Sequence, residues 1–230
     1  MDLDKEMTAV FRKNLEPDQN LVKNCKSEAE NGNRDAMLWL ARMYRDGRGT
    51  EKDLGNAAEW YRRITEKNAD LANEFADVLS EIGTPESYEE MVSVIIGHSR
   101  SGNAGATRRM GTAYRQGKGV KKDLDAAIMY QRVATCEGQK EAAGELVLAL
   151  LERRTEEDLE EAFVMASCYR DYDDPDLAVH LSHMYRYGIG TEKNIDAAIE
   201  HMAFASERGH DAAKTELAEL LSERDGNTGN

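Results

Sequence analysis

The chain has 230 residues, of which 40% are hydrophobic and 32% are charged, and its formal net charge is −14 at pH 7. Because nucleic acids demand a basic surface, this balance argues against a nucleic-acid partner. No uninterrupted apolar run approaches the length of a transmembrane helix, so we expect no membrane insertion.

Cysteine usage and the start of the chain indicate a compartment. The three cysteines, Cys25, Cys136 and Cys168, are odd in number and far apart in sequence, which favours reduced thiols over a disulfide framework. The first residues are charged where a signal peptide needs an apolar stretch. We therefore predict a cytoplasmic protein.

The sequence opens with two short helical patterns, over residues 3–14 and 18–30, which lack the motif that follows them. We expect residues 1–31 to form a degenerate helical pair that caps the fold.

A motif then occurs three times at a nearly constant spacing. Its copies read Tyr44-x-x-Gly47-x-Gly49-x-x-x-Asp53, Tyr114-x-x-Gly117-x-Gly119-x-x-x-Asp123 and Tyr185-x-x-Gly188-x-Gly190-x-x-x-Asn194. A fixed period is typical of stacked repeat proteins, so the motif predicts a solenoid of helical hairpins.

The motif residues are typical of the positions where helices end and begin. Ala36, Leu40 and Tyr44 share one face of a first helix. Gly47 follows that helix, where a left-handed residue favours glycine, and Asp53 is a good N-cap for a second helix. We expect the loop to be explained entirely by these roles.

Weaker copies lie between the strong ones. Equivalent joints at Gly32, Asn68, Gly102, Gly138, Asp173 and Gly209 give units 32–67, 68–101, 102–137, 138–172 and 173–208. Units 68–101 and 138–172 are degenerate: Thr84-Pro85-Glu86 replaces one loop, with a second helix beginning near Ser87, and Arg153-Arg154 replaces the other loop's glycine. We expect a capping helix over 209–224 and a flexible tail over 225–230.

The motif, with its following Ala57-Ala58 pair and Trp60-Tyr61, resembles the Sel1-like repeat, a relative of the tetratricopeptide repeat. The resemblance is specific in units 32–67, 102–137 and 173–208. It implies an all-α fold, a right-handed superhelical α-solenoid of about six helix-turn-helix repeats. It also implies a scaffold for protein assemblies.

Residues that could carry chemistry have structural explanations. The Gly-x-Gly pairs follow helices and lack the context of a phosphate loop. His180 and His183 share a helix face, but no third ligand is placed by spacing, so we expect no metal and no cofactor. His201 stands at the Trp60 position and is expected to pack. Cys136 and Cys168 are expected to be buried, and no nucleophile has a recognisable base, so we expect no enzyme.

A row of arginines is less easily explained. Arg45, Arg115 and Arg186 each follow the motif tyrosine. By analogy with tetratricopeptide repeats, whose first helices line a concave groove, the groove would contain Leu38, Arg42, Arg45, Arg108, Thr112, Arg115, Val179, His183 and Arg186. Arginine pairs bidentately with carboxylates, so this row suits an acidic peptide or a C-terminal carboxylate. The alternative is that each arginine pairs with acids of neighbouring units, as Glu81 could do for Arg45.

The sequence favours a non-catalytic scaffold or adaptor that binds a partner protein or acidic peptide in its groove. The alternative is an accessory subunit of polysaccharide or cell-envelope metabolism that contacts a glycan, for which Tyr169, Tyr172 and Tyr187 lie outside the predicted core. The oligomeric state stays open, although the apolar run Val92–Ile96 could contribute to self-association.

Overall fold

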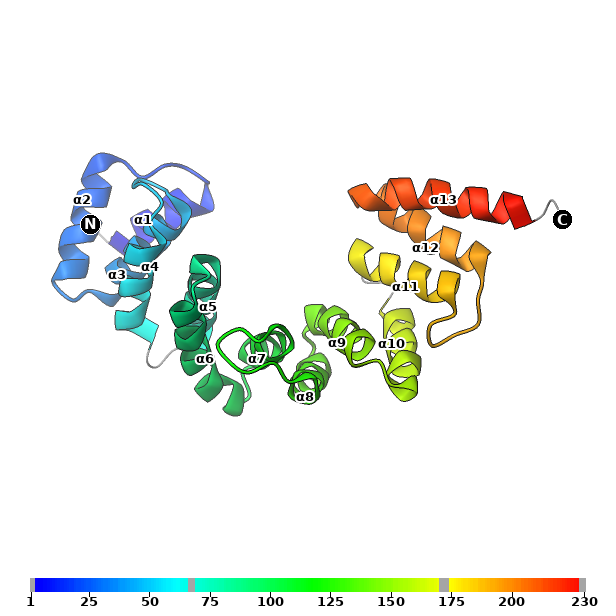
Figure 1. Ribbon diagram of the computed structural model, residues 1–230. Helices are drawn as coiled ribbons and strands as arrows, with labels where there is room; N and C mark the ends of the chain where they lie inside the picture. Colours follow the sequence, from blue (N-terminus) through cyan, green and yellow to red (C-terminus); the bar gives the residue numbers. More distant parts are fainter. Residues whose placement is uncertain (1–2, 66–68, 170–173, 228–230) are drawn as a thin grey trace. The chain divides into compact units, whose positions relative to one another are not determined.

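The computed structural model describes residues 3–65, 69–169 and 174–227, and these residues form thirteen α-helices and no β-strand (Figure 1). The joints predicted at Asn68 and Asp173, and Tyr172, lie outside the described residues. The prediction of an all-α fold is confirmed. None of the described helices combines the length and the apolar character needed to cross a bilayer.

The chain divides into two compact units. The N-terminal unit comprises Met1–Met110 with the loop Gly117–Lys121, and the C-terminal unit comprises Gly111–Gln116 with Lys122–Asn230. Helix α7 is therefore shared between the two units.

The N-terminal unit holds α1 (Leu3–Arg12), α2 (Gln19–Glu30), α3 (Arg34–Asp46), α4 (Leu54–Ile64), α5 (Ala69–Ile82), α6 (Pro85–Arg100) and the start of α7 (Ala104–Gln116). The C-terminal unit holds the end of α7, α8 (Leu124–Cys136), α9 (Lys140–Arg153), α10 (Glu156–Cys168), α11 (Pro175–Tyr187), α12 (Ile195–Glu207) and α13 (Asp211–Asn227).

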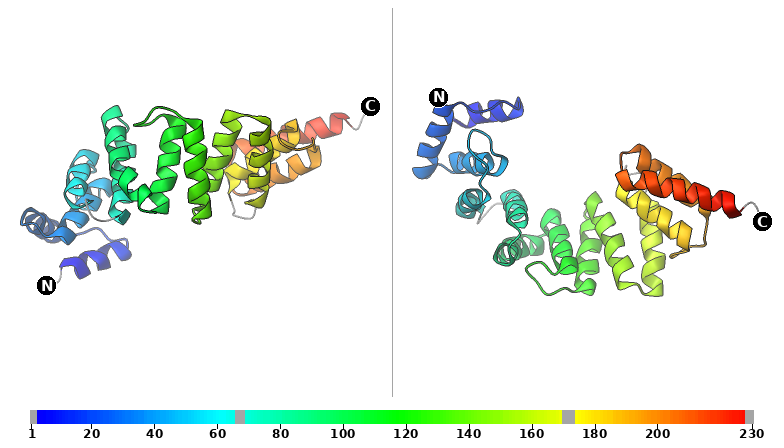
Figure 2. Two further views of the ribbon diagram at one scale, coloured as in Figure 1. Left: turned by 90° about the horizontal axis from the view of Figure 1, so that it is seen from below. Right: turned by 45° about the horizontal axis from the view of Figure 1, so that its top comes forward.

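In each unit, successive helices pack as hairpins. In the C-terminal unit α9 packs against both α8 and α10, and α12 packs against both α11 and α13 (Figure 2). Leu146, Leu150 and Leu181 are almost fully buried in one core cluster of this unit, as Leu40 and Met43 are in the N-terminal unit. Each helix buries one apolar face against its neighbours.

The motif residues cap their helices as predicted. Gly47 has a left-handed φ of 71° and its N–H donates to Met43 O, while the Asp53 side chain accepts from Asn56 N. A further bond clasps the loop in all three copies, because the N–H of Asp53, Asp123 or Asn194 donates to the carbonyl of the motif tyrosine. These bonds satisfy backbone groups that the helix ends leave open.

The second glycine of each motif has a role that helix capping does not explain. A Cβ atom at Gly119 would overlap the backbone of Tyr88, and one at Gly190 would overlap the backbone of Leu159. Gly49 is similarly close to the side chains of Pro17 and Val22. The expectation that capping explains the whole loop is therefore wrong, since this glycine lets the loop lie against the second helix of the preceding hairpin.

The degenerate units keep their helices by other means. Arg154 takes the left-handed conformation of the missing glycine, with φ 64°, and its N–H donates to Leu150 O. Helix α6 begins at Pro85, earlier than the predicted start near Ser87, because Thr84 and Ser87 form a capping box and proline suits the first turn.

Other local predictions need correction. Cys25 is buried, but Cys136 and Cys168 are exposed rather than buried, because each is the last residue of its helix and lies on the outward side. Helix α13 continues to Asn227, past the predicted end at Arg224, so the helix enters the segment predicted as a tail.

Candidate partner-binding surface

In the N-terminal unit, two of the predicted arginines meet one carboxylate. Arg42 and Arg45 lie on α3, and Glu74 lies on α5 of the next hairpin. Arg42 Nη2 is 2.6 Å from Glu74 Oε1, and Arg45 Nη1 is 3.2 Å from Glu74 Oε2. The hydroxyl of Tyr61 donates to the same carboxylate at 2.8 Å. The cluster joins α3, α4 and α5.

These contacts keep the cluster charged. Burial is the largest influence on the pKa of Glu74 and acts to raise it, but hydrogen bonds from Arg42 and Tyr61 outweigh burial and hold the pKa below its usual range. Burial raises the pKa of the Tyr61 hydroxyl, so this group stays a hydrogen-bond donor at physiological pH. All three charged side chains keep roughly a quarter of their surface exposed.

Helix α7 carries the next predicted residues. Arg108 is half-buried, and the neighbouring Arg109 forms an ion pair with Asp77 at 2.7 Å. Further along, in the C-terminal unit, Thr112 Oγ1 accepts a hydrogen bond from Gln131 Nε2 at 3.2 Å. Thr112 thus ties α7 to α8.

Arg115 repeats the arrangement of Arg45. Its Nη2 is 3.0 Å from Glu145 Oε2 on α9, and its Nη1 is 3.9 Å from Glu152. The ring of Tyr114 stacks on Tyr130 at a centroid distance of 5.6 Å. The tyrosine therefore packs within its own hairpin while the next residue reaches the following one.

The arrangement occurs a third time between α11 and α13. His183 Nε2 lies 2.5 Å from Glu216 Oε2. Arg186 Nη2 lies 2.9 Å from Glu223 and its Nη1 lies 3.7 Å from Glu219. Tyr187, the next residue, is 54% exposed.

The structure thus places each motif arginine beside glutamates of the following first helix: α3 beside α5, α7 beside α9, and α11 beside α13. We call these positions the arginine–glutamate face of each unit. The internal pairing left open by the sequence is present, but Arg45 pairs with Asp46 on its own helix at 2.6 Å and with Glu74 at 3.2 Å. Glu81, named for that role, instead pairs with Lys52 at 2.6 Å.

Comparison with known proteins identifies the repeat. The Sel1 repeat family model matches residues 34–68, 104–136 and 175–210. A Sel1 repeat protein from Oxalobacter formigenes has a similar structure, with a TM-score of 0.72 and 20% identity over 94% of this chain and 89% of that chain. The chain is a Sel1-like repeat protein.

A second similar structure is a protective antigen of uropathogenic Escherichia coli strains that displays an SLR fold. It has a TM-score of 0.52 and 20% identity over 88% of this chain and 52% of that chain, so the chain spans about half the length of that antigen. At this identity the two likenesses show the fold alone.

The position that Trp60 occupies in the first Sel1 repeat holds other rings in the later repeats, and these rings stack on the motif tyrosine. The ring of His201 stacks on Tyr185 at 5.6 Å with an interplanar angle of 4°, in the place where Tyr130 stacks on Tyr114. The prediction that His201 packs is confirmed.

The two histidines that share a helix face, His180 and His183, have different surroundings. His183 contacts Glu216, while burial lowers the pKa of His180 and favours its neutral form. Within residues 3–65, 69–169 and 174–227, no group of three or more His, Cys, Asp or Glu side chains has the geometry of a metal site.

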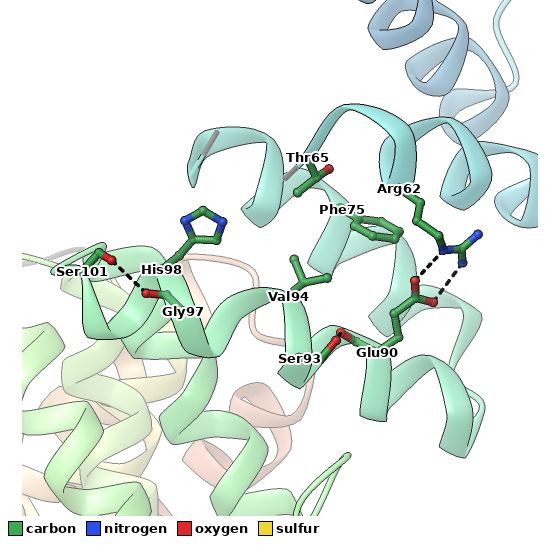
Figure 3. Close-up of a pocket in the computed structure, with 9 residues that line it drawn as sticks. All are labelled: Arg62, Thr65, Phe75, Glu90, Ser93, Val94, Gly97, His98 and Ser101. Carbon is green, nitrogen blue, oxygen red and sulfur yellow. Dashed lines mark hydrogen bonds and ion pairs between the residues drawn. The ribbon is translucent and has the colours of Figure 1, made fainter. Parts of the chain in front are cut away.

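The N-terminal unit also has a cavity of about 560 Å³ on the side of its second helices (Figure 3). Phe75 and Val94 form its apolar wall, and Arg62 pairs with Glu90 at its edge with Nε–Oε1 2.7 Å. Ser93 Oγ donates to Glu90 O and Ser101 Oγ donates to Gly97 O. The side chains of Arg62, Glu90, Ser93 and Ser101 therefore already have partners in the wall of the cavity.

Proposed function

We propose that this Sel1-like repeat protein is a non-catalytic scaffold that binds a partner protein along its arginine–glutamate face. Sel1 repeats generally mediate protein–protein interactions. The observation that supports this surface is the recurrence of partly exposed Arg–Glu pairs between one first helix and the next, at Arg45, Arg115 and Arg186.

The binding chemistry we propose is exchange of carboxylates. A carboxylate of the partner takes the place of Glu74, Glu145 or Glu223, so the charge-assisted bonds lost within the chain are replaced by bonds of the same kind. The guanidinium fork then binds the new carboxylate bidentately. An acidic peptide segment or a C-terminal carboxylate is therefore the partner that this face suits in each unit. Arg42 and Arg108 lie on first helices of the N-terminal unit, and Thr112 and His183 lie on first helices of the C-terminal unit.

We also propose that the protein works in the cytoplasm. Cys136 and Cys168 are exposed and unpaired, a state that a reducing compartment preserves. Fractionation of cells that produce the tagged protein tests this, and recovery from an oxidising compartment would contradict it.

The scaffold proposal is tested with two matched variants in an affinity pull-down. Arg45→Gln/Arg115→Gln/Arg186→Gln removes the motif arginines. Arg62→Gln/Arg63→Gln/Arg132→Gln removes three arginines from second helices, two of which pair with Glu90 and Glu161. Both variants change the net charge equally, and circular dichroism must show that both keep their helices.

We expect wild type and the second-helix variant to recover the same protein, and the motif-arginine variant to lose at least about tenfold of it, since each displaced charge-assisted bond is worth about 1.5–3 kcal/mol when desolvated. Equal recovery by both variants would contradict the assigned face. If neither the wild type nor either variant recovers a protein, the scaffold proposal fails and direct glycan contact takes its place.

A further inference from the structure

The second helices of the C-terminal unit carry an apolar band that faces outward. Met129 and Val133 on α8 are 54% and 45% exposed, and Val164 on α10 is 56% exposed. The exposed Cys136 and Cys168 end the same two helices. Helices α8 and α10 lie side by side there, because Arg132 Nε is 2.9 Å from Glu161 Oε1. We call these five residues the α8–α10 band.

The N-terminal unit shows what these positions hold elsewhere in the same fold. Its second helices α4 and α6 are joined by Arg62 and Glu90, the counterparts of Arg132 and Glu161. Counted from the N-caps, Met129 corresponds to Glu59, Val164 to Ser93 and Cys168 to Gly97. Figure 3 shows Ser93 and Gly97 on α6.

Helix α12 repeats the comparison. Counted from its N-cap Asn194, the position of Met129 is occupied by Glu200, which is exposed. The repeat therefore places a charged residue at the outward position of Met129 twice, so the hairpin does not need an apolar side chain there. Exposed apolar clusters on a soluble protein mark interaction sites.

The rim of the band is acidic. Glu137 on the α8 side and Glu157 and Glu160 on α10 are exposed, and none of them forms an ion pair within the part of the chain that the structure describes. Arg132, the basic residue between the two helices, is already neutralised by Glu161. The band thus presents apolar surface with negative charge around it.

This charge selects the occupant. A second copy of the chain would bring the same acidic rim against itself, and an anionic membrane surface would be repelled by it. A basic segment is attracted to the acidic rim, and the exposed apolar residues of the band suit the apolar stripe of an amphipathic helix. We propose that the α8–α10 band binds an amphipathic helix of a partner protein, with leucine-like residues on Met129, Val133 and Val164 and lysine or arginine at the acidic rim.

This surface is independent of the arginine–glutamate face. It lies on second helices, it has the opposite charge preference, and it involves none of Arg45, Arg115 or Arg186. Loss of one interaction therefore leaves the other measurable.

The test uses a fluorescent synthetic peptide of leucine and lysine arranged as an amphipathic helix. A leucine–glutamate peptide of the same pattern is its charge control. The protein variant Met129→Glu/Val164→Ser installs the residues that Glu59 and Ser93 occupy in the N-terminal unit, so the fold accommodates both changes. Leu15→Ser, at a residue that is 54% exposed in the N-terminal unit, controls for loss of exposed apolar surface in general.

We expect the leucine–lysine peptide to bind wild type and Leu15→Ser equally in fluorescence anisotropy. Met129→Glu/Val164→Ser should weaken binding about tenfold or more, as truncation of central apolar anchors does. The variant makes the protein one charge more negative, so attraction by charge alone would strengthen. Unchanged or tighter binding by the variant, binding of the leucine–glutamate peptide as tight as that of the leucine–lysine peptide, or no peptide binding by wild type would each overturn the proposal.

The native thiols provide a second readout. Bound peptide should slow alkylation of Cys136 and Cys168 in wild type, because both end the helices that it covers, and should leave alkylation unchanged in Met129→Glu/Val164→Ser. A peptide that binds without protecting either thiol lies elsewhere. Sedimentation of the protein alone tests whether a second copy of the chain occupies the band. A wild-type dimer that is lost in Met129→Glu/Val164→Ser would show this and overturn the proposal.

Discussion

Single residues decide how closely successive hairpins pack in each unit. Both glycines of the motif have positive φ, but they differ in their surroundings: Gly188 caps α11, while Gly190 lies against the backbone of Leu159 on α10. A left-handed conformation can be adopted by another residue at a cost, as Arg154 does. Where another backbone segment lies too close for a Cβ atom, only glycine fits.

This difference predicts a graded effect of alanine within the C-terminal unit. Gly138→Ala meets no atom within 4 Å and suffers only the strain of φ 84°, which costs about 1 kcal/mol. Gly190→Ala suffers similar strain at φ 66° and also overlaps Leu159, and overpacking adds about 1–3 kcal/mol. Urea unfolding followed by circular dichroism should show the larger loss for Gly190→Ala. Equal losses would mean that the close approach does not contribute to stability.

At the scale of helices, an ion pair fixes the start of α10. Arg153 Nε donates to Asp158 Oδ2 at 2.8 Å, and Asp158 also completes the capping box of Thr155 while being 1% exposed. The bond from Arg153 is the largest influence that lowers the pKa of Asp158, from an ordinary 3.8 to about 2.

A lowered pKa makes stability depend on acid. The charged form of Asp158 stabilises the fold above its unfolded pKa near 4, and this contribution is lost as the pH falls from about 4 to about 2. The shift corresponds to roughly 2 kcal/mol. Asp158→Asn should therefore destabilise the protein by up to about that amount at pH 6, and the difference from wild type should shrink toward pH 2.5. A difference that is constant with pH would rule out the charge as its source.

The sequence predicts helices best where local chemistry determines their ends. Gly47 and Asp53 have side-chain or backbone preferences that act within a few residues, so α3 and α4 are predictable. Arg154 has no such preference, and its left-handed conformation follows from packing of the degenerate unit. The exposure of Cys136 and Cys168 also depends on which side of the helix the neighbouring hairpin covers.

The candidate surface was accessible to sequence reasoning only in part. The position of Arg45, Arg115 and Arg186 after the motif tyrosine is a local signal. Glu74 and Glu145 are recognisable as their partners only once α5 and α9 are stacked on the preceding hairpins, because many acidic residues of this chain compete for the role. The α8–α10 band does have a signal in the sequence, because Met129 stands at the repeat position that Glu59 and Glu200 occupy in other units.

For the whole molecule, the net charge of −14 does not describe its surfaces. The arginine–glutamate face presents both signs in alternation, whereas the α8–α10 band presents apolar residues with acidic ones. We propose that these two surfaces hold two chemically different partners, an acidic one on the arginine–glutamate face and a basic one on the α8–α10 band.

Photo-crosslinking in living cells tests whether a partner protein binds the arginine–glutamate face. A photoreactive amino acid is placed on first helices, at Leu38, Arg108 or Tyr187, and on second helices away from the α8–α10 band, at Glu59, Arg63 or Glu200. We expect a covalent adduct with one and the same protein from the first-helix positions and none from the second-helix positions. Adducts that arise only from Glu59, Arg63 or Glu200 would contradict this expectation, as would the absence of a protein adduct from every first-helix position.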